Sequence, residues 1–358
     1  MPFNAPRLEI HPDRIAGNAR SVIAACHAHG GTVACVTKAV CAHPAVVRAM
    51  VLGGADMIAD SRLENLEAVA GSGLSLPRLL LRLPAPSQAL EVVRRADVSL
   101  HSSLEGIRCL SEAARSLDRR HQVILMVDLG DLREGVWPDR AMEVLQGACR
   151  LPHIEVLGLG CNLACFSGVV PTVENMEALA ALRDQGRRLT GLELATLSGG
   201  NSSSLALLAS GRLPKAINHF RLGESILLGR DVLDRTPLPG TRQDAFRMVA
   251  EVVEVERKPS MPVGVRRQNA FGEIPACADR GIRLRAILNV GRQDVAVDGL
   301  TPELPGVTVL GGSSDHLVLD VEDAPGPVRL GDELAFQPGY GALLALATSP
   351  FVRKVVLA

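Results

Sequence analysis

The stretch HQVILMVDLGDLREGVWPDRAMEVLQGAC, residues 121–149, contains one full copy of the pattern that decides the fold. Its first part, residues 121–128, is a short apolar run typical of a buried strand. A loop rich in Gly and charged residues follows, and residues 138–149 then carry apolar side chains at helical spacing. A buried strand followed by a helix is the βα unit from which parallel sheets are built.

The same unit occurs eight times in succession, after a first helix that begins near Pro12 and ends at Gly30-Gly31. Eight consecutive βα units over about 200–250 residues predict an α/β fold with a closed, TIM-like (β/α)8 barrel. A doubly wound open sheet is the alternative, because strand propensity alone does not prove closure. The expected strands are 33–37, 56–59, 78–82, 97–100, 121–128, 154–162, 193–198 and 217–221. The expected helices are 44–53, 61–70, 86–95, 104–117, 138–149, 172–187 and 202–210, with a short helix after Gly223.

The pattern of the chain changes after residue 235. The linker 236–241 is rich in Pro and Gly, and segments such as 248–256 and 316–321 alternate apolar with polar residues. Alternation with a period of two indicates short strands that bury one face. We therefore expect two domains, the barrel over residues 1–235 and a mainly-β C-terminal domain over residues 236–358.

Charge and composition argue against several classes of partner. The 358 residues carry 38 Lys and Arg against 39 Asp and Glu, so no global field attracts nucleic acid or an anionic membrane. With one Trp, one Tyr and seven Phe, a platform for stacking single-stranded nucleic acid is not expected either. Two uncharged stretches, 156–173 and 334–352, contain Pro and Gly, so we expect strands and loops there rather than membrane spans.

The cysteine pattern indicates a reducing compartment. Eight cysteines occur without a CxxC pair, most of them in apolar runs, and the first ten residues lack the apolar stretch of a secretory signal. We therefore expect a cytoplasmic protein. Cys161 and Cys165 have a spacing that a zinc site on a helix would use, but the Gly, Asn and Pro around them indicate a loop, so no metal site is expected.

Polar residues at the strand ends are the first candidates for chemistry, because the βα loops of such barrels converge there. Lys38 directly follows the first strand, behind four largely apolar residues. A lysine held among apolar neighbours at a barrel end can act as a Schiff-base amine. A solvated loop lysine is the alternative. Arg133 and Asn162 lie after the fifth and sixth strands in the same way.

The loops after the seventh and eighth strands have the composition of a phosphate site. Residues 198–204 read SGGNSSS, and residues 223–225 read GES. Glycines let backbone N–H groups approach an anion and hydroxyls add hydrogen bonds, while a helix N-terminus favours negative charge. The alternative is that Ser202 or Ser203 only caps a helix. Two such loops on adjacent strands, opposite Lys38, predict a phosphorylated cofactor with a carbonyl group that reaches the lysine.

Eight short motifs, in this order along nearly the whole chain, match a known family: 36–40, 127–135, 159–164, 197–203, 220–223, 289–295, 312–316 and 340–344. The chain resembles the fold-type III pyridoxal-phosphate enzymes, which have an alanine-racemase-like barrel followed by a β domain. It is most similar to the branch that contains the ornithine racemases. The resemblance implies pyridoxal 5'-phosphate as cofactor, an amino acid as substrate, and a homodimer with shared active sites.

The same resemblance implies a role for each matching residue. Lys38 would form the Schiff base with the cofactor, Arg133 would lie near the cofactor hydroxyl and the substrate carboxylate, and Arg221 would face the pyridine nitrogen. Tyr340 would contact the phosphate. The remaining implied cofactor-binding residues are Asn162 against the ring, and Ser198, Asn201, Ser202, Gly223 and Glu224 around the phosphate loops.

The arginine at position 221 bears on the type of reaction. An arginine stays protonated and donates a hydrogen bond without giving up its proton, so the pyridine nitrogen would remain unprotonated. The cofactor is then a weaker electron sink, which disfavours transamination and favours return of the proton to Cα. The resemblance therefore implies exchange of the α proton. A salt bridge between Arg221 and Glu224 is the alternative role.

Racemisation needs a base on each face of the carbanion, and only the first is readily assigned. Lys38 would serve one face. The family places a tyrosine of the partner subunit on the other face, but here Phe271 occupies the matching position. The candidates for this base, in falling order, are His316, Asp315, Glu273 and Cys277. A histidine at a strand edge with no catalytic role is the alternative for His316.

Asp315 also bears on the choice of substrate. It resembles a family position near the substrate entrance of the other subunit, where a carboxylate would suit a cationic side chain such as that of ornithine or lysine. We therefore expect racemisation of a basic amino acid. The alternatives are an alanine or broad-specificity racemase, and a decarboxylase, D-amino-acid aldolase or dehydratase on the same scaffold. A pyridoxal-phosphate carrier is a third possibility, although such single-barrel proteins lack the β domain.

Overall fold

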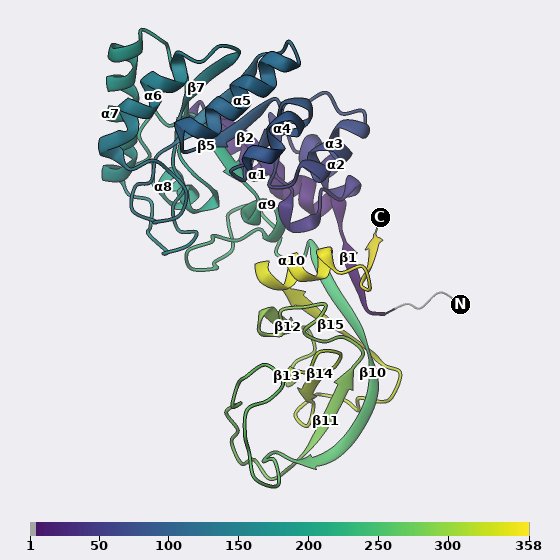
Figure 1. Cartoon of the computed structure of the whole chain (residues 1–358). Coiled ribbons are helices and arrows are strands. Elements are labelled where there is room, and N and C mark those ends of the chain that lie inside the picture. Colours follow the sequence, from purple (N-terminus) through teal and green to yellow (C-terminus); the bar gives the residue numbers. More distant parts are fainter. Residues whose placement is uncertain (1–4, 358) are drawn as a thin grey trace. The chain divides into compact units, whose positions relative to one another are not determined.

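The computed structural model describes residues 5–357, which form two compact units (Figure 1). The barrel unit comprises Pro12–Gln243. The β unit comprises residues 5–11 together with residues 244–357. The C-terminal part of the β unit begins at Asp244, eight residues after the expected start at residue 236. Residues 5–11 belong to the β unit, although they were expected in the barrel domain.

The barrel unit is a closed ring of eight parallel strands within the described residues, so the prediction of a (β/α)8 barrel is confirmed. Closure is direct, because the last strand pairs with the first through Val33 and Phe220. The doubly wound alternative is therefore wrong. The strands are β2 (Thr32–Val36), β3 (Met57–Asp60), β4 (Arg78–Leu80), β5 (Val98–His101), β6 (His121–Met126), β7 (Ile154–Gly160), β8 (Thr196–Ser198) and β9 (His219–Leu222).

Helices follow the strands and cover the outside of the ring (Figure 1). The first, α1 (Pro12–His29), precedes the ring as expected. The expected helix over 202–210 is divided into a 3-10 turn, Ser202–Ser204, which the Asn201 side chain caps, and the short α8, whose N-cap residue is Ser204. The others are α2 (Pro44–Leu52), α3 (Leu63–Gly71), α4 (Ala89–Arg95), α5 (Leu104–Ser116), α6 (Ala141–Cys149), α7 (Val173–Thr190), α8 (Leu205–Ala209) and α9 (Glu224–Leu228).

The interior of the ring is a packed apolar core. Alternate residues of each strand point inward, and fully burying one such aliphatic side chain stabilises the fold by about 1.5–3 kcal/mol. This core closes the barrel, so polar chemistry is confined to the strand ends. Its buried members are Ala34, Val36, Ala59, Leu79, Val98, Leu100, Ile124 and Met126.

The β unit contains an antiparallel sheet in the order β12-β15-β10-β11-β14-β13, as the mainly-β prediction requires. The short β1 (Arg7–Ile10), which the sequence reasoning missed, pairs with both β10 and β16. The long β10 carries an irregularity between Val252 and Glu254. The bounds are β10 (Phe246–Pro259), β11 (Ile282–Leu288), β12 (Leu300–Pro302), β13 (Thr308–Gly312), β14 (Leu317–Asp320), β15 (Glu333–Pro338) and β16 (Arg353–Val356).

One helix stands where strands and loops were expected. The uncharged stretch 334–352 contains β15 but continues as α10 (Tyr340–Thr348). Among the helices of the described residues, none has both the length and the apolar character that a membrane crossing needs.

Candidate active site

Lys38 lies at the C-terminal end of β2, and the residue before it is held in place by a buried hydrogen bond. The Thr37 hydroxyl donates to Asp60 Oδ2 over 2.6 Å, and the Asp60 carboxylate also accepts from the Arg62 backbone N–H at 2.9 Å and from Asn65 Nδ2 at 3.0 Å. Burial raises the pKa of the Asp60 carboxyl, although these hydrogen bonds oppose the shift. The carboxylate therefore ties the loop that carries Lys38 to the next strand end.

Lys38 is half-buried, and its ammonium group has no side-chain partner among the described residues. An amine without an ion pair is available to react with a carbonyl group. Sequence reasoning missed Thr37 and Asp60. The signal was present in two polar residues, Thr37 at the end of the first predicted strand and Asp60 directly after the second.

Arg221, on β9, is buried at 4% exposure without a carboxylate partner in the part of the chain that the structure describes. Its Nη2 donates to the Cys161 carbonyl oxygen over 2.6 Å, and its Nη1 donates to the Ser198 hydroxyl. Burial lowers the pKa of the guanidinium. The proposed salt bridge from Arg221 to Glu224 is not formed, because Glu224 pairs with Arg235 instead.

The direction of the hydrogen bonds behind Arg221 can be derived from its chemistry. A guanidinium has donors only, so Ser198 Oγ accepts from Arg221, and we expect its own proton to be donated to its other partner. That partner is His219 Nδ1 at 2.7 Å. With this direction His219 is neutral and carries its proton on Nε2, which is buried without a partner among the described residues. Burial and the positive charge of Arg221 lower the His219 pKa to about 3.

The loops after β8 and β9 are joined to each other by hydrogen bonds. Ser202 Oγ and Ser225 Oγ are 2.9 Å apart, and the Ser225 N–H donates to Ser202 Oγ over 3.3 Å. Gly200 has φ +110°, a conformation that side-chain-bearing residues rarely adopt. The Asn201 side chain caps the turn by accepting from the Ser203 N–H at 2.7 Å, so its oxygen is used within the loop. Gly223 precedes α9 as its N-cap.

Asn162 offers an unused donor at the end of β7. Its Oδ1 accepts from Asn201 Nδ2 at 3.2 Å, while its own Nδ2 is buried with no hydrogen-bond partner. Asn201 Nδ2 also donates to the Leu163 carbonyl oxygen over 2.8 Å, which fixes the orientation of both amides. A buried amide N–H without an acceptor is costly, so this atom fits a ligand that brings one.

Arg133, in the loop after β6, is exposed and pairs with its neighbour Glu134. Its Nη1 also contacts Cys165 Sγ at 2.8 Å. The loop that carries Cys165 is organised by Asp131, whose carboxylate accepts from four backbone N–H groups of residues 165–169. Cys161 is buried, and burial raises its pKa to about 12. Within residues 5–357 no group of three His, Cys, Asp or Glu residues is arranged to hold a metal ion.

The other predicted residues belong to the β unit. Tyr340 is the first residue of α10. Asp315 and His316 are exposed in the turn between β13 and β14, where the Asp315 carboxylate accepts from Gln293 Nε2 at 2.8 Å and from Ser314 Oγ at 2.7 Å. These two partners are neutral, so the charge of Asp315 is not balanced.

The segment that replaces the family tyrosine is bound to an arginine. The Phe271 ring lies 4.4 Å from the Arg292 guanidinium carbon, and Arg292 Nη1 pairs with Glu273 Oε1 at 3.0 Å. Hydrogen bonds from Arg292 and Asn269 lower the pKa of Glu273. A carboxylate held in this way is a weak base, and Cys277 is exposed nearby in the chain.

The chain matches a known protein family over most of the barrel. Residues 10–231 match the family described as alanine racemase, N-terminal domain. The chain belongs to the alanine racemase family. The family prediction is thereby confirmed.

Two curated relatives of this alanine racemase family member match it along almost its entire length. It is 38% identical to the ornithine racemase of Acetoanaerobium sticklandii over 353 residues, which cover 98% of this chain and 99% of the relative. It is 39% identical to the lysine racemase of Thermotoga maritima over 350 residues, which cover 98% of both chains.

Solved structures share the fold. The alanine racemase of Streptomyces coelicolor A3(2) superposes with a TM-score of 0.76 at 18% identity, covering 98% of this chain and 97% of the other. A D-threonine aldolase from Filomicrobium marinum gives 0.74 at 18% identity, covering 99% and 92%. At such identities the likeness concerns architecture alone, since one fold serves several reactions.

Proposed function

We propose that this chain is a pyridoxal-phosphate-dependent racemase of a basic amino acid such as ornithine or lysine. One observation carries the proposal. The two full-length relatives, at 38% and 39% identity, are racemases named for ornithine and lysine, whose side chains both end in an ammonium group. The eight cysteines are free thiols in the described chain, which supports a place in the reducing cytoplasm.

The strand ends fit the cofactor that the family implies. The half-buried Lys38 would bind its aldehyde carbon, and the linked loops at Ser202 and Ser225 would hold its phosphate. The unpaired Nδ2 of Asn162 would donate to an acceptor of the ring system. When bound, the cofactor supplies an electron-withdrawing ring next to the amino acid's Cα.

The role of Arg221 follows from its surroundings. Its guanidinium is buried and, among the described residues, donates to a carbonyl oxygen and a hydroxyl rather than to a carboxylate. It therefore offers a permanent donor to an aromatic nitrogen bound at this end of the barrel. Because the guanidinium keeps its proton, the nitrogen would stay unprotonated. This arrangement favours return of a proton to Cα over other fates of the substrate.

The proton transfers need two groups. Lys38 would move a proton on one face of Cα. For the other face we propose His316 of a second copy, with Asp315 next, because a homodimer with shared sites would bring the β unit of one copy to the barrel of the other. The uncompensated Asp315 carboxylate would also bind the side-chain ammonium of a basic substrate.

A direct test is the incubation of the purified, cofactor-loaded protein with L-ornithine, L-lysine and L-alanine in D2O. We expect deuterium at Cα and both enantiomers by chiral chromatography, with the two basic amino acids faster than alanine. The protein should also show the absorbance band of a covalently bound cofactor, which Lys38→Ala removes.

The other outcomes identify the alternatives. Release of CO2, ammonia or an aldehyde would replace the proposal by a decarboxylase, dehydratase or aldolase. Faster turnover of alanine would keep the cofactor chemistry and reject the basic substrate. Cofactor binding without conversion of any amino acid would indicate a carrier.

A further inference from the structure

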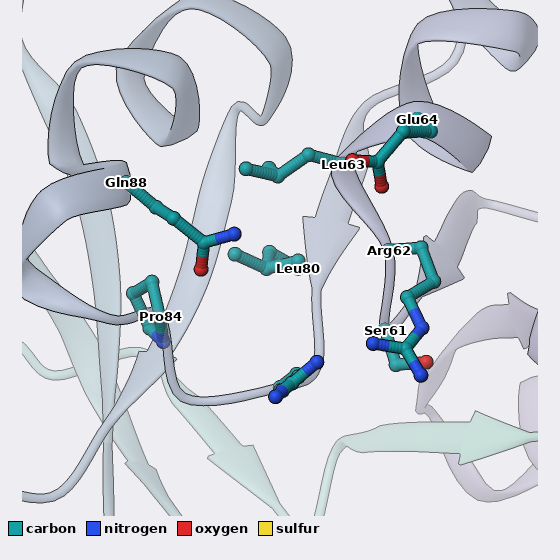
Figure 2. A pocket seen from close by; sticks show the side chains of 8 residues that line it. Ser61, Arg62, Leu63, Glu64, Leu80, Pro84 and Gln88 are labelled. Atoms are coloured by element: carbon teal, nitrogen blue, oxygen red, sulfur yellow. The ribbon is translucent and has the colours of Figure 1, made fainter.

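A small pocket opens beside the candidate active site, between the ends of β3 and β4 (Figure 2). It has an empty volume of about 350 Å³, part of which is open to solvent. Because β2, β3 and β4 are parallel neighbours, the pocket lies at the same barrel end as Lys38. Its lining residues are Ser61, Arg62, Leu63, Glu64, Leu80, Arg82, Pro84 and Gln88.

The local sequence shapes this pocket in two ways. The buried Asp60 carboxylate accepts from the Arg62 backbone N–H, which fixes Arg62 as the residue before α3 and leaves its side chain to extend outward. On the other wall, Gln88 Oε1 accepts from the Ala85 N–H at 3.2 Å, so its amide nitrogen is left for a ligand. Leu63 and Leu80 are buried, so they form an apolar floor.

The charges of the lining do not balance. The guanidinium groups of Arg62 and Arg82 have no carboxylate partner among the described residues, and Glu64 is the single acidic side chain of the lining. Figure 2 shows the Arg62 side chain extending toward Ser61 and away from Glu64. The lining therefore offers two positive charges, a hydroxyl and an amide N–H against one negative charge.

Other arginines of the same elements are ion-paired, so a shortage of carboxylates does not explain the two free guanidinium groups. Arg78, on β4, pairs with Asp97 at 3.2 Å. Arg94 and Arg95, on α4, both pair with Glu91, at 2.6 and 3.0 Å. Arg62 and Arg82, by contrast, line the pocket without a carboxylate partner in the part of the chain that the structure describes.

We propose that this pocket binds a small oxyanion, either a carboxylate or a phosphate group, between Arg62 and Arg82. Planar guanidinium groups bind such anions through charge-assisted hydrogen bonds, and Ser61 and Gln88 add neutral donors. The first turn of α3 opens onto the same space, and its dipole favours an anion further. The pocket contains neither Lys38 nor any residue assigned above to the cofactor, so the proposal is independent of the racemase reaction.

The test measures anion binding rather than turnover. The full chain is saturated with pyridoxal phosphate, so that the phosphate loops are filled, and is titrated by calorimetry with succinate and, separately, with inorganic phosphate. Each of Arg62→Gln and Arg82→Gln should weaken binding about fivefold to tenfold, because each removes one partly solvent-screened charge. Glu64→Gln should strengthen it about twofold, since a like charge is removed.

Arg48→Gln is the matched control, because Arg48 is an exposed arginine on α2 outside the pocket and its loss changes the net charge equally. Tighter binding of succinate identifies a carboxylate ligand, and tighter binding of phosphate identifies a phosphate group. The proposal is overturned if neither anion binds at tens of millimolar. It is also overturned if the two pocket variants bind like the wild type, or if Arg48→Gln weakens binding as much as they do. Circular dichroism on each variant confirms that the comparison is between folded proteins.

Discussion

The proton on His219 is determined by a residue two positions away. Arg221 can only donate to Ser198 Oγ, so we expect the Ser198 hydroxyl to donate to His219 Nδ1. We expect His219 to be neutral, with its proton on Nε2, from pH 8 to pH 5, because burial and the Arg221 charge lower its pKa to about 3. Two-dimensional nitrogen NMR of histidine-labelled protein, without added cofactor, reads this tautomer directly.

The Arg221→Gln variant separates the hydrogen bond that Arg221 donates to Ser198 from the effect of its charge on the His219 pKa. Its amide can supply only a neutral donor to Ser198, and the charge that lowers the His219 pKa is lost. The His219 resonances should then begin to titrate at higher pH than in the wild type. A doubly protonated His219 near pH 7 in the wild-type protein would contradict the expected hydrogen bond from the Ser198 hydroxyl to His219 Nδ1.

The charge of Arg221 also leads to a prediction about the rate of racemisation. We expect Arg221→Gln to lower the rate of racemisation about 100-fold, in the range measured when one preorganised donor is removed from an active site. Arg221→Lys keeps the charge but lacks the planar pair of donors, so its rate should lie between the two. The rates are measured by polarimetry with saturating cofactor. Racemisation by Arg221→Gln at the wild-type rate would remove Arg221 from the mechanism.

At the scale of elements, three strands of the barrel bury neutral histidines. His101 on β5 and His121 on β6 share Ser99 as partner, at 3.0 and 2.8 Å, and His219 lies on β9. Burial lowers the pKa of His101 to about 3 and that of His121 to about 4. Each histidine therefore binds a proton in the unfolded chain long before it does so in the folded barrel.

This difference predicts the acid sensitivity of the barrel unit. A folded pKa below the unfolded value of about 6.5 means that the stability contribution is present above pH 6.5 and is lost as the pH falls toward 4. When the pH is lowered from 7.5 to 5.5, the three histidines together should decrease the free energy of unfolding by about 4 kcal/mol. Urea unfolding at several pH values measures the slope, and His121→Gln should reduce it by about a third. A flat profile over this range would show that the histidines titrate alike in both states.

The elements also show what sequence reasoning can reach. The barrel was predictable because eight βα units each follow from local patterns such as residues 121–149. β1 was missed because its four residues are paired with β10 and β16, which follow more than 230 positions later. The apolar stretch of α10 has no polar face, and periodicity alone does not distinguish a buried helix from a strand. The strand ends were predicted from the sequence. The hydrogen bonds of Thr37 to Asp60 and of Ser198 to His219 were not, because they join residues over 20 positions apart.

At the scale of the whole molecule, the candidate residues are divided between two units. Lys38 and Arg221 belong to the barrel unit, whereas Asp315, His316 and Tyr340 belong to the β unit. The proposed homodimer with shared sites makes this division testable, because a site built from two copies can be repaired by mixing two defective chains. A site built within one copy cannot.

We expect Lys38→Ala and His316→Ala each to be nearly inactive alone, and an equimolar mixture, unfolded and refolded together, to regain about a quarter of the wild-type activity. Half of the mixed chains form heterodimers, and each heterodimer holds one site with both residues intact and one site with neither, as expected for a twofold-symmetric dimer. Light scattering checks the dimer, and the cofactor absorbance checks that the His316→Ala barrel still binds it. If the mixture stays inactive while both chains fold and dimerise, His316 does not act across the interface. Full activity of His316→Ala alone would exclude His316 as the second base and leave Asp315 as the next candidate.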